Sequence, residues 1–468
     1  MNLNMIFVRA QAFISVYDNN IDALIPELWA NESLAILEEN MVVANLVHRD
    51  FQPVFAKFGD IVHTRRPGEF SAKRKTVTDD VTVQDATSTD VQVPLNQHVH
   101  VSFLLRDGEE TLAFKDLVDV YMAPAMLAQA RFIDMVCLGQ YPRFLTNAYG
   151  TLGGLTSSNV KDRILGTRNL MNVNKAYVGG RNLIWGPSSE TIALQLAEFT
   201  QVQDAGDGGL ALREASLGRK FQFNNYMCQN MAEVEVGNTT SAGAINLTAG
   251  YAVGSTALVV DGITGIIANN TWLKIAGDDS PQRVVSHTET LGNTTGLVIS
   301  PGLRRAVVDN AVITFYTPGA INFAAGYAAG WSKPMVIDGF TVAPKAGQLI
   351  TLGTTDTSVV YTVIEATTTS ILLDRPLEAA VADNAAVNVG PAGNYNFAFH
   401  RNAMTLVVRP FQTPRAGTGA LSAVVNMNGL SMRATITYDG TKQGHLVTLD
   451  MLCGIQVLDT NLGAVLLG

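Results

Sequence analysis

The N-terminal part of the chain shows a helical hydrophobic pattern. Between Ile21 and Val47, Pro26 suits a first helical turn. The apolar residues that recur at steps of three and four are Leu34, Leu37, Met41 and Ala44. This spacing places them on one helical face. We therefore expect an amphipathic N-terminal arm, which we assign to residues 1–55.

Between Asp60 and Arg106 the hydrophobic period changes from helical to extended. Val91, Val93 and Leu95 alternate with polar residues, and the same alternation continues at Val99, Val101 and Phe103. A period of two indicates β-strands, so we expect a long β-hairpin within residues 56–110. Its middle section carries basic residues followed by acidic ones: Arg65, Arg66, Lys73, Arg74, Lys75, Asp79, Asp80, Asp85 and Asp90. Few large apolar groups lie among them, so the hairpin should project from the body and contact a partner.

A second helical pattern follows, within residues 111–160. Met122, Met126, Ala130, Ile133 and Cys137 form one apolar stripe, which is more often core than anything specialised. We expect one long helix from Pro124 to Gln140, because proline suits a helix start and Pro142 follows its end.

The segment from 161 to 235 mixes strand and helix patterns. We expect short strands at Lys175–Val178 and Asn182–Trp185, and a Ser-capped helix over Ser188–Phe199.

An internal repeat dominates residues 236–395. Residues 245–254, INLTAGYAVG, return as INFAAGYAAG at 321–330, and DGIT at 261–264 returns as DGFT at 338–341. The two copies span 245–314 and 321–388, and Asp-Gly and Asp-Asn pairs mark tight turns in both. We expect tandem β modules, each a small barrel or sandwich. Strand-like patterns resume over 396–468, so the modules interrupt a discontinuous parent domain.

Composition and charge exclude several function classes. The 468 residues carry 32 basic and 41 acidic side chains, a net charge of −9, which disfavours general DNA binding. Charged residues make up 16% and hydrophobic residues 47%, so the chain can build large cores. No apolar run is long enough for a membrane span, and Arg9 and Gln11 interrupt what would be a signal core. We expect neither a membrane segment nor a secretion signal.

The candidate chemical groups have simpler structural explanations. His98 and His100 share a strand face, where two imidazoles could bind a metal, but no third ligand is nearby. Asp278 and Asp279 could join a calcium site, although a polar hairpin turn is the simpler interpretation. Three cysteines without CxxC spacing, Cys137, Cys228 and Cys453, disfavour a disulfide framework and structural zinc and fit a reducing compartment.

We therefore expect no catalytic residues, metal or cofactor. No phosphate loop, zinc-protease motif, nucleophile elbow or dinucleotide fingerprint occurs in the sequence. The basic cluster of residues 65–75 could contact nucleic acid, a neighbouring subunit or only solvent. The candidate intersubunit contacts are Arg65, Arg66, Lys73, Arg74, Lys75, Asp79, Asp80, Asp278 and Asp279.

The order of these segments resembles a major coat protein of tailed double-stranded DNA bacteriophages, in the podovirus-type subgroup with an inserted β domain. The local runs that carry the resemblance are Asn394–Pro410, His445–Leu458, Trp272–Gly277 and Val359–Ile364. The resemblance implies an α+β, HK97-like fold with an extended loop, a spine helix with a peripheral domain, and an axial domain divided between 161–235 and the return at 396–468. A second inserted module departs from that pattern.

The resemblance also implies function and partners. These are self-assembly into pentamers and hexamers of an icosahedral shell, a separate scaffolding protein, a portal, and a decoration or cement protein. It implies only weak contacts with packaged DNA and a location in the virion after synthesis in the bacterial cytoplasm. A β-rich adhesin or tail-fibre protein is the alternative, favoured by the repeats. An enzyme is a third hypothesis, but the sequence contains no recognisable catalytic arrangement of residues.

Overall fold

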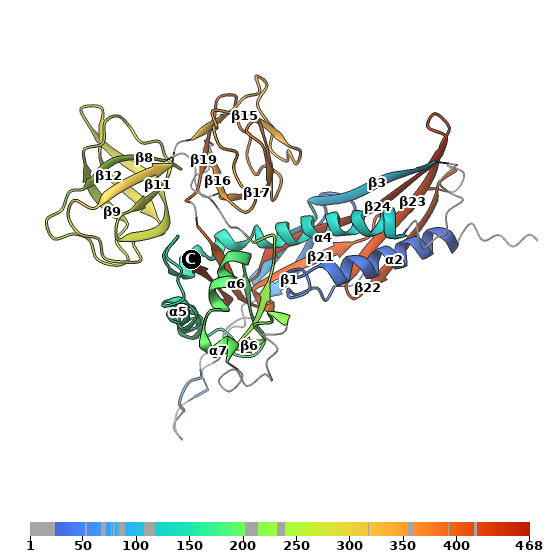
Figure 1. Ribbon diagram of the computed structural model, residues 1–468, viewed down its shortest axis with the longest axis horizontal. Helices are drawn as coiled ribbons and strands as arrows, with labels where there is room; N and C mark the ends of the chain where they lie inside the picture. Colours follow the sequence, from blue (N-terminus) through green and yellow to red (C-terminus); the bar gives the residue numbers. More distant parts are fainter. Residues whose placement is uncertain are drawn as a thin grey trace, which may run out of the picture.

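Strands form most of this α+β chain, and two β-barrels sit beside an elongated body (Figure 1). The computed structural model describes residues 24–51, 54–66, 72–75, 77, 80–81, 83, 89–106, 118–201, 214–231, 239–316, 318–353, 359–391, 393–415 and 419–468.

A five-stranded antiparallel sheet forms the long arm of the body. Its strands are β3 (Gln97–Arg106), β21 (Met404–Arg409), β22 (Leu421–Met427), β23 (Leu430–Asp439) and β24 (Gly444–Val457). Helices α2 (Leu24–Asn40) and α4 (Ala123–Leu138) pack against it, and their apolar faces share one core with the sheet. A π-helical turn, η1 (Val118–Met122), precedes α4.

A six-stranded mixed sheet forms the other part of the body. In spatial order it contains β4 (Ala148–Gly150), β25 (Gly463–Leu467), β20 (Tyr395–His400), β5 (Arg181–Trp185), β7 (Phe223–Met227) and β6 (Arg219–Lys220). Every residue of β5 and β25 is buried, as expected for central strands covered on both faces. The helices of this part are η2 (Tyr141–Asn147), α5 (Val160–Val173), α6 (Pro187–Ala193) and α7 (Ala197–Thr200), and two short turns are η3 (Arg401–Ala403) and η4 (Thr460–Leu462).

Each copy of the repeat forms a closed six-stranded barrel. The first barrel contains β8 (Thr239–Ile245), β9 (Ala257–Asp261), β10 (Trp272–Ile275), β11 (Asp278–Thr290), β12 (Asn293–Ser300) and β13 (Val312–Tyr316). The second contains β14 (Gly319–Ile321), β15 (Met335–Asp338), β16 (Leu349–Leu352), β17 (Tyr361–Ala366), β18 (Ser370–Leu373) and β19 (Ala386–Val389). Aligned in chain order, the two sets of strands have the same circular order.

The repeated residues make the same hydrogen bonds in both barrels. The Val259 N–H donates to the Tyr251 hydroxyl at 2.7 Å, and the Val336 N–H donates to the Tyr327 hydroxyl at 2.8 Å. Asn310 and Asn384 both adopt the left-handed backbone region, with φ of 60° and 58°, which asparagine tolerates better than most residues. The sequence repeat therefore reflects conserved turn geometry within one chain.

Two of the three strands within residues 56–110 form a hairpin, and the third pairs elsewhere. β1 (Ile61–Arg66) pairs antiparallel with β2 (Thr89–Pro94), whereas β3, which contains Val99, Val101 and Phe103, pairs with β24. The chain breaks its strand between Pro94 and Gln97, and the buried side chains of β3 join the body core. The alternation in the sequence identified the strands but contains no information about their partners.

Three other elements predicted from the sequence differ from those in the structure. The first helix ends at Asn40, and residues 41–47 form turns whose backbone groups bond to α4. Lys175–Val178 is not a strand, because Lys175 has a positive φ of 57° at the end of α5. The helix expected over Ser188–Phe199 is two short helices, and Gly186 rather than Ser188 occupies the N-cap position of the first.

Candidate assembly surfaces

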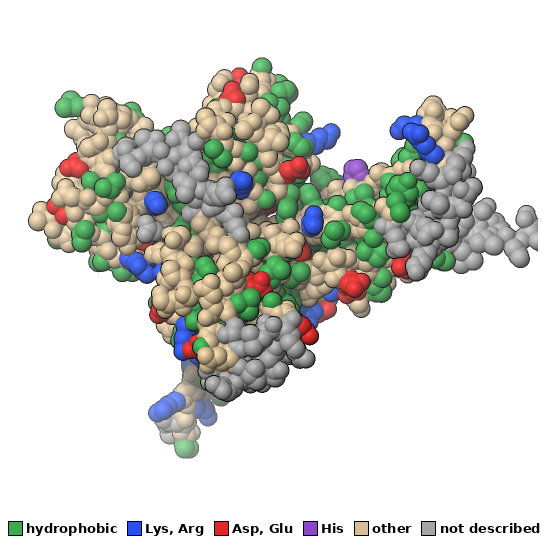
Figure 2. Space-filling view, viewed as in Figure 1, with side chains coloured by type: hydrophobic (Ala, Val, Ile, Leu, Met, Phe, Trp, Pro, Cys, Tyr) green, Lys and Arg blue, Asp and Glu red, His purple; other side chains and the backbone are tan. Residues whose placement is uncertain are grey.

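The β1–β2 hairpin lies against the body, and the described residues beyond its far end have exposed side chains. Its register runs from Ile61 opposite Pro94 at the base to Arg66 opposite Thr89. Beyond that end, Val77, Val81 and Val83 are 101%, 74% and 84% exposed. Figure 2 shows Lys and Arg side chains at the end of a narrow projection below the body. These three valines are therefore apolar side chains that their own chain leaves uncovered. We call described residues 72–83 the hairpin tip.

Most of the sequence-predicted contact residues on the hairpin are exposed. The described ones at the tip are Lys73, Arg74, Lys75 and Asp80, and Arg65 is exposed on β1. Arg66 forms an ion pair of 2.8 Å with Asp459 of the same chain, which holds the hairpin against the body. Asp79 and the side chain of Asp279 lie outside the described residues.

Asp278 is not a surface contact, contrary to expectation. Its carboxylate is fully buried and accepts hydrogen bonds from the Ser280 hydroxyl, the Gln282 amide and the backbone N–H of Arg304. The residue begins β11 and turns inward, so it satisfies buried donors of the first barrel. A sequence pair of aspartates in a turn does not reveal which carboxylate points inside.

The second barrel is fastened to η2, just after α4, and to the start of β3. The Tyr141 hydroxyl donates a 2.7 Å hydrogen bond to the Gly347 carbonyl, and the Gln97 side chain donates to the Asp374 carbonyl at 2.8 Å. At Gly139 a Cβ would lie only 2.7 Å from Thr362 Oγ1 and 2.8 Å from Asp374 Cβ. Glycine is therefore required for the barrel to approach this closely.

A buried ion pair lies at the same contact. Asp374 is fully buried and accepts from Arg375 at 2.8 Å and from the Thr362 N–H at 2.8 Å. Burial raises the pKa of Asp374 above its usual value, although Arg375 and the Thr362 N–H act in the opposite direction. Burial also lowers the pKa of Arg375, but the attraction of Asp374 and Glu378 outweighs this and the pKa is raised. The pair is thus strongly coupled inside the protein.

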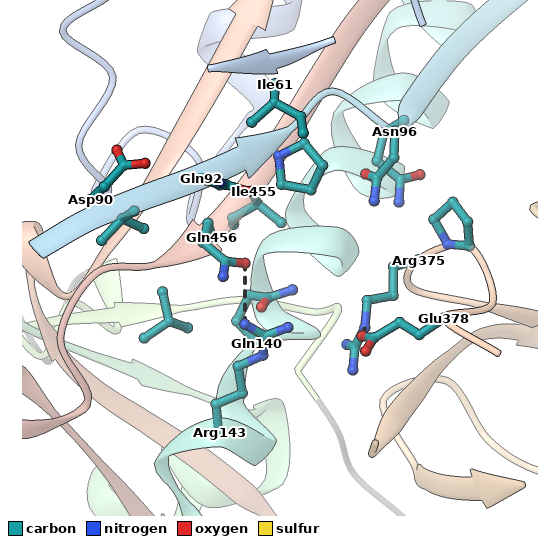
Figure 3. Close-up of a pocket in the computed structure, with 15 residues that line it drawn as sticks. Ile61, Asp90, Gln92, Asn96, Gln140, Arg143, Arg375, Glu378, Ile455 and Gln456 are labelled. Atoms are coloured by element: carbon teal, nitrogen blue, oxygen red, sulfur yellow. Dashed lines mark hydrogen bonds and ion pairs between the residues drawn. The ribbon is translucent and has the colours of Figure 1, made fainter. Parts of the chain in front are cut away.

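A pocket of about 630 Å³ opens beside this ion pair, and we call it the junction pocket (Figure 3). It lies between β2 of the hairpin, the segment that follows α4, β24 and the second barrel. Its polar lining includes Asp90, Gln140, Arg143, Arg375, Glu378 and Gln456. Figure 3 shows Gln140, Arg143 and Gln456 close together on one side, with Arg375 and Glu378 facing them from the second barrel.

The charges of the junction pocket are unevenly paired. Glu378 binds Arg375 at 2.9 Å, and Asp90 binds His63 at 2.7 Å. Arg143 donates to the neutral Gln456 side chain at 3.1 Å and forms no ion pair with the described carboxylates. Burial and the nearby Arg375 lower the pKa of Arg143, whereas Glu378 and Asp374 act in the opposite direction. The pocket therefore holds a half-buried guanidinium near two carboxylates of the second barrel, without a direct ion pair to either.

The first barrel has its own anchors. Arg304 donates a 2.6 Å hydrogen bond to the Ala148 carbonyl at β4, and the Thr351 hydroxyl of the second barrel donates to the Asn270 carbonyl at 2.7 Å. Burial lowers the pKa of Arg304 to about 10, although Asp278 partly offsets this. Both barrels are thus fixed through hydrogen bonds between polar groups at their contacts.

A buried carboxylate joins the N-terminal segment to α4. Asp134 accepts hydrogen bonds from the backbone N–H groups of Val42, Val43 and Ala44 at 2.9, 3.0 and 2.9 Å. Burial raises the pKa of Asp134 to about 6, although the three N–H groups lower it. This contact fixes the turn after α2 on the long helix.

The described residues show no arrangement typical of catalysis or metal binding. No group of three His, Cys, Asp or Glu side chains could hold a metal ion within the described ranges. His98 instead lies 3.3 Å from Asp450, which Arg433 also binds. All three cysteines are buried free thiols. A search of the described helices found none with the length and apolar character needed to cross a bilayer.

The chain is similar to several solved phage capsid structures. It matches the capsid of the cyanophage P-SCSP1u with 9% identity, 91% coverage of this chain, 88% of that chain and a TM-score of 0.42. The mature capsid of bacteriophage PhiM1 gives 7% identity, 91% and 86% coverage and a TM-score of 0.38. The capsid of Staphylococcus phage Andhra gives 7% identity, coverage of 90% of this chain and 84% of that chain, and a TM-score of 0.37. No protein-family model and no curated protein sequence matches the chain. These TM-scores are all below 0.5.

Sequence patterns do not reveal the junction pocket or the anchors of the second barrel. Gln140 and Arg143 follow the helix end directly, and Asp374 is adjacent to Arg375. Their adjacency was visible, but Gln140 and Arg375 are separated by more than 200 positions. Only the folded chain brings them to one pocket.

Proposed function

We propose that this chain is the major capsid protein of a tailed double-stranded DNA bacteriophage and assembles into an icosahedral shell. The observation that carries the proposal is the projecting hairpin tip, where Val77, Val81 and Val83 are each at least 74% exposed. Burial of apolar surface stabilises by about 25 cal/mol per Å², so copies that cover one another's tips gain free energy at every contact. Repeated weak contacts of this kind favour closed symmetric assemblies.

The remaining architecture supports an HK97-like arrangement. In this proposal, residues 1–55 form the N-terminal arm, 56–110 the extended loop and 111–160 the spine helix with the peripheral domain. Residues 161–235 and 396–468 form the axial domain and complete the peripheral domain, and 236–395 form the tandem inserted β modules of a podovirus-type coat. The support is the order of elements: a helix, a projecting hairpin, α4 along an elongated sheet, and barrels that interrupt a mixed sheet.

Partners and location follow from the same proposal. The copies would form pentamers and hexamers with a scaffolding protein, a portal and a decoration or cement protein, and the shell would be a virion component made in the bacterial cytoplasm. The net charge of −9 is consistent with weak contacts to packaged DNA, because strong binding needs excess Lys and Arg.

Size-exclusion chromatography followed by negative-stain electron microscopy tests the proposal. Purified chain, alone or with the scaffolding protein of its phage, should give closed shells or large rings. Fibres or trimers would favour the adhesin or tail-fibre alternative, for which the tandem barrels are the supporting feature. A stable monomer under all these conditions would overturn the capsid proposal.

A further inference from the structure

The second barrel carries a row of three aromatic side chains at its surface. The ring centroids of Phe323 and Tyr327 lie 4.9 Å apart at an interplanar angle of 21°, and those of Tyr327 and Trp331 lie 5.0 Å apart. Tyr327 is 4% exposed, whereas Phe323 and Trp331 are 41% and 37% exposed. Because one face of Phe323 stacks on Tyr327, its exposed surface is the other face and the ring edge. We call these three residues the aromatic row.

The first barrel contains the position of Phe323 without the ring. The backbone N–H of Phe323 donates to the Asp383 carboxylate at 2.9 Å, and the backbone N–H of Leu247 donates to the Asp309 carboxylate at 3.0 Å. The two turns therefore match, and a leucine in one barrel corresponds to a phenylalanine in the other.

The position of Trp331 also has a match without a ring. The carbonyl of Trp331 accepts a hydrogen bond from the N–H of Leu377 at 3.0 Å, and the carbonyl of Ser255 accepts one from the N–H of Leu303 at 2.9 Å. Both barrels close with the same strand order, so the fold needs neither exposed ring. Exposed apolar groups that the fold does not need are typical of a ligand-binding surface.

The charge of the second barrel indicates which ligand suits the aromatic row. Residues 319–389 contain three basic and six acidic side chains, a net charge of −3. Stacking surfaces for single-stranded nucleic acid combine their aromatic rings with a positively charged groove, so this charge disfavours a nucleic acid. An organic cation is best held over ring faces that converge on it, whereas these rings follow one another in series. A neutral hexopyranose fits better, because the C–H groups on one side of the sugar pack against the electron-rich face of an aromatic ring.

Polar groups beside the row can bind the hydroxyl groups of a sugar. The Asp383 carboxylate accepts from the Phe323 N–H and from the Asn384 side chain, both at 2.9 Å. A carboxylate has about four acceptor positions, so further hydroxyl donors can be accommodated. Asn322 and Ser332, which are exposed and adjacent in the chain to Phe323 and Trp331, add an amide and a hydroxyl.

We propose that the aromatic row is a carbohydrate-binding site. Phe323 and Trp331 pack against the C–H faces of neutral hexopyranose units, and Asp383 accepts hydrogen bonds from their hydroxyl groups. The centroid spacings place the two outer rings at most about 10 Å apart, a span that a short oligosaccharide covers. This activity goes beyond the proposed capsid function and does not depend on assembly. In a shell, one site per copy would raise the avidity for a polymeric sugar without any new contact.

Affinity electrophoresis of the full-length, unassembled chain tests the site. Native gels contain one neutral polysaccharide at a time: mannan, soluble starch, hydroxyethylcellulose or glycol chitin. At least one of them should retard the wild-type chain. Phe323→Leu combined with Trp331→Ser gives the second barrel the residues of the first and should weaken binding about tenfold or more, because both stacking rings are lost.

Two further variants separate the rings from general apolar surface. Phe323→Tyr combined with Trp331→Phe keeps both rings and should keep most of the retardation. Val342→Ser removes an exposed apolar side chain elsewhere on the second barrel and should migrate like the wild type. The melting temperature of each variant verifies that it folds.

Three results would overturn the carbohydrate site. They are no retardation by any of the polysaccharides, retardation that survives the loss of both rings, and retardation only in gels that contain single-stranded DNA. None of these results bears on the capsid proposal, which electron microscopy of the same wild-type preparation tests separately.

Discussion

The hydroxyl of Tyr141 donates a 2.7 Å hydrogen bond to the carbonyl of Gly347, and this bond ties η2, just after the long helix, to the second barrel. Both residues are part of one contact that also includes Gly139 and the buried Asp374. The repeat is therefore joined to the parent body at a specific place, and changes there should separate the stability of the barrel from that of the body.

Replacing Tyr141 by Phe should loosen the second barrel. The change keeps the ring but removes the donor to Gly347, and loss of one such bond costs about 1 kcal/mol. Hydrogen exchange should become faster at the backbone N–H groups of the second barrel, while exchange in β23 and β24 should stay the same. Tyr177→Phe, on an exposed ring, is the control and should change neither. Equal acceleration throughout the chain would argue against a separate barrel attachment.

Gly139→Ala should disturb the same contact by overpacking. The new Cβ would lie 2.7 Å from Thr362 Oγ1 and 2.8 Å from Asp374 Cβ, and overpacking of this kind costs about 1–3 kcal/mol. The melting temperature should fall. Adding Thr362→Ala removes one of the two close atoms and should recover part of the loss.

The control for this clash is Gly179→Ala. A Cβ at Gly179 meets nothing within 4 Å, so this variant should melt like the wild type. A melting temperature of Gly139→Ala that equals the control value would show that the barrel can shift away at little cost.

Arg375→Met should be strongly destabilising because it leaves the buried Asp374 carboxylate uncompensated. Breaking a buried pair in this way costs about 3–5 kcal/mol. Asp374→Asn together with Arg375→Met should recover much of it, since no unpaired charge remains. Chemical denaturation followed by a probe in the second barrel measures both values.

The pH dependence of Arg375→Met has a definite sign. Burial raises the pKa of Asp374 in the folded chain, so the folded state binds a proton more readily than the unfolded state. Stability of the variant should therefore be greater at acid pH and decline as pH rises through the folded pKa. A deficit relative to wild type that grows toward acid pH would contradict this account.

Asp134 should make stability decline between about pH 4 and pH 6. Its folded pKa is about 6, above the usual 3.8, so protonation favours the folded chain at low pH and that contribution is lost as pH rises through 6. The full effect is on the order of 3 kcal/mol. Asp134→Asn does not titrate. The difference in melting temperature, wild type minus variant, should therefore fall with increasing pH across this window.

The proposed titration of Asp134 can also be contradicted by the same measurement. A melting-temperature difference that stays constant from pH 4 to pH 8 would mean that Asp134 titrates normally in the folded chain. Independently of pH, the variant should exchange the N–H groups of Val42 to Ala44 faster, because an amide offers them only one acceptor oxygen.

Local pattern determined much of the element structure. The apolar stripe through Met126, Ile133 and Cys137 predicted the long helix, and α4 covers Ala123–Leu138. The repeated INxxAGYAxG segments predicted two equivalent β modules within one chain, and the strands of residues 239–389 close into two barrels of the same order. These features depend on neighbours a few residues apart, whose spacing is written directly in the sequence.

Tertiary structure alone decided the pairing and the polar contacts. Val99 and Val101 lie on β3, which pairs with β24 almost 350 residues later rather than with β2, and Asp278 turns into the first barrel instead of facing a partner. The junction pocket joins Arg143 to residues of the hairpin and the second barrel. The alternation of apolar and polar residues along a strand shows which side chains share a face. The strand that pairs with it, and whether a charged side chain is buried, depend on which distant surfaces pack together. That packing is a property of the whole folded chain.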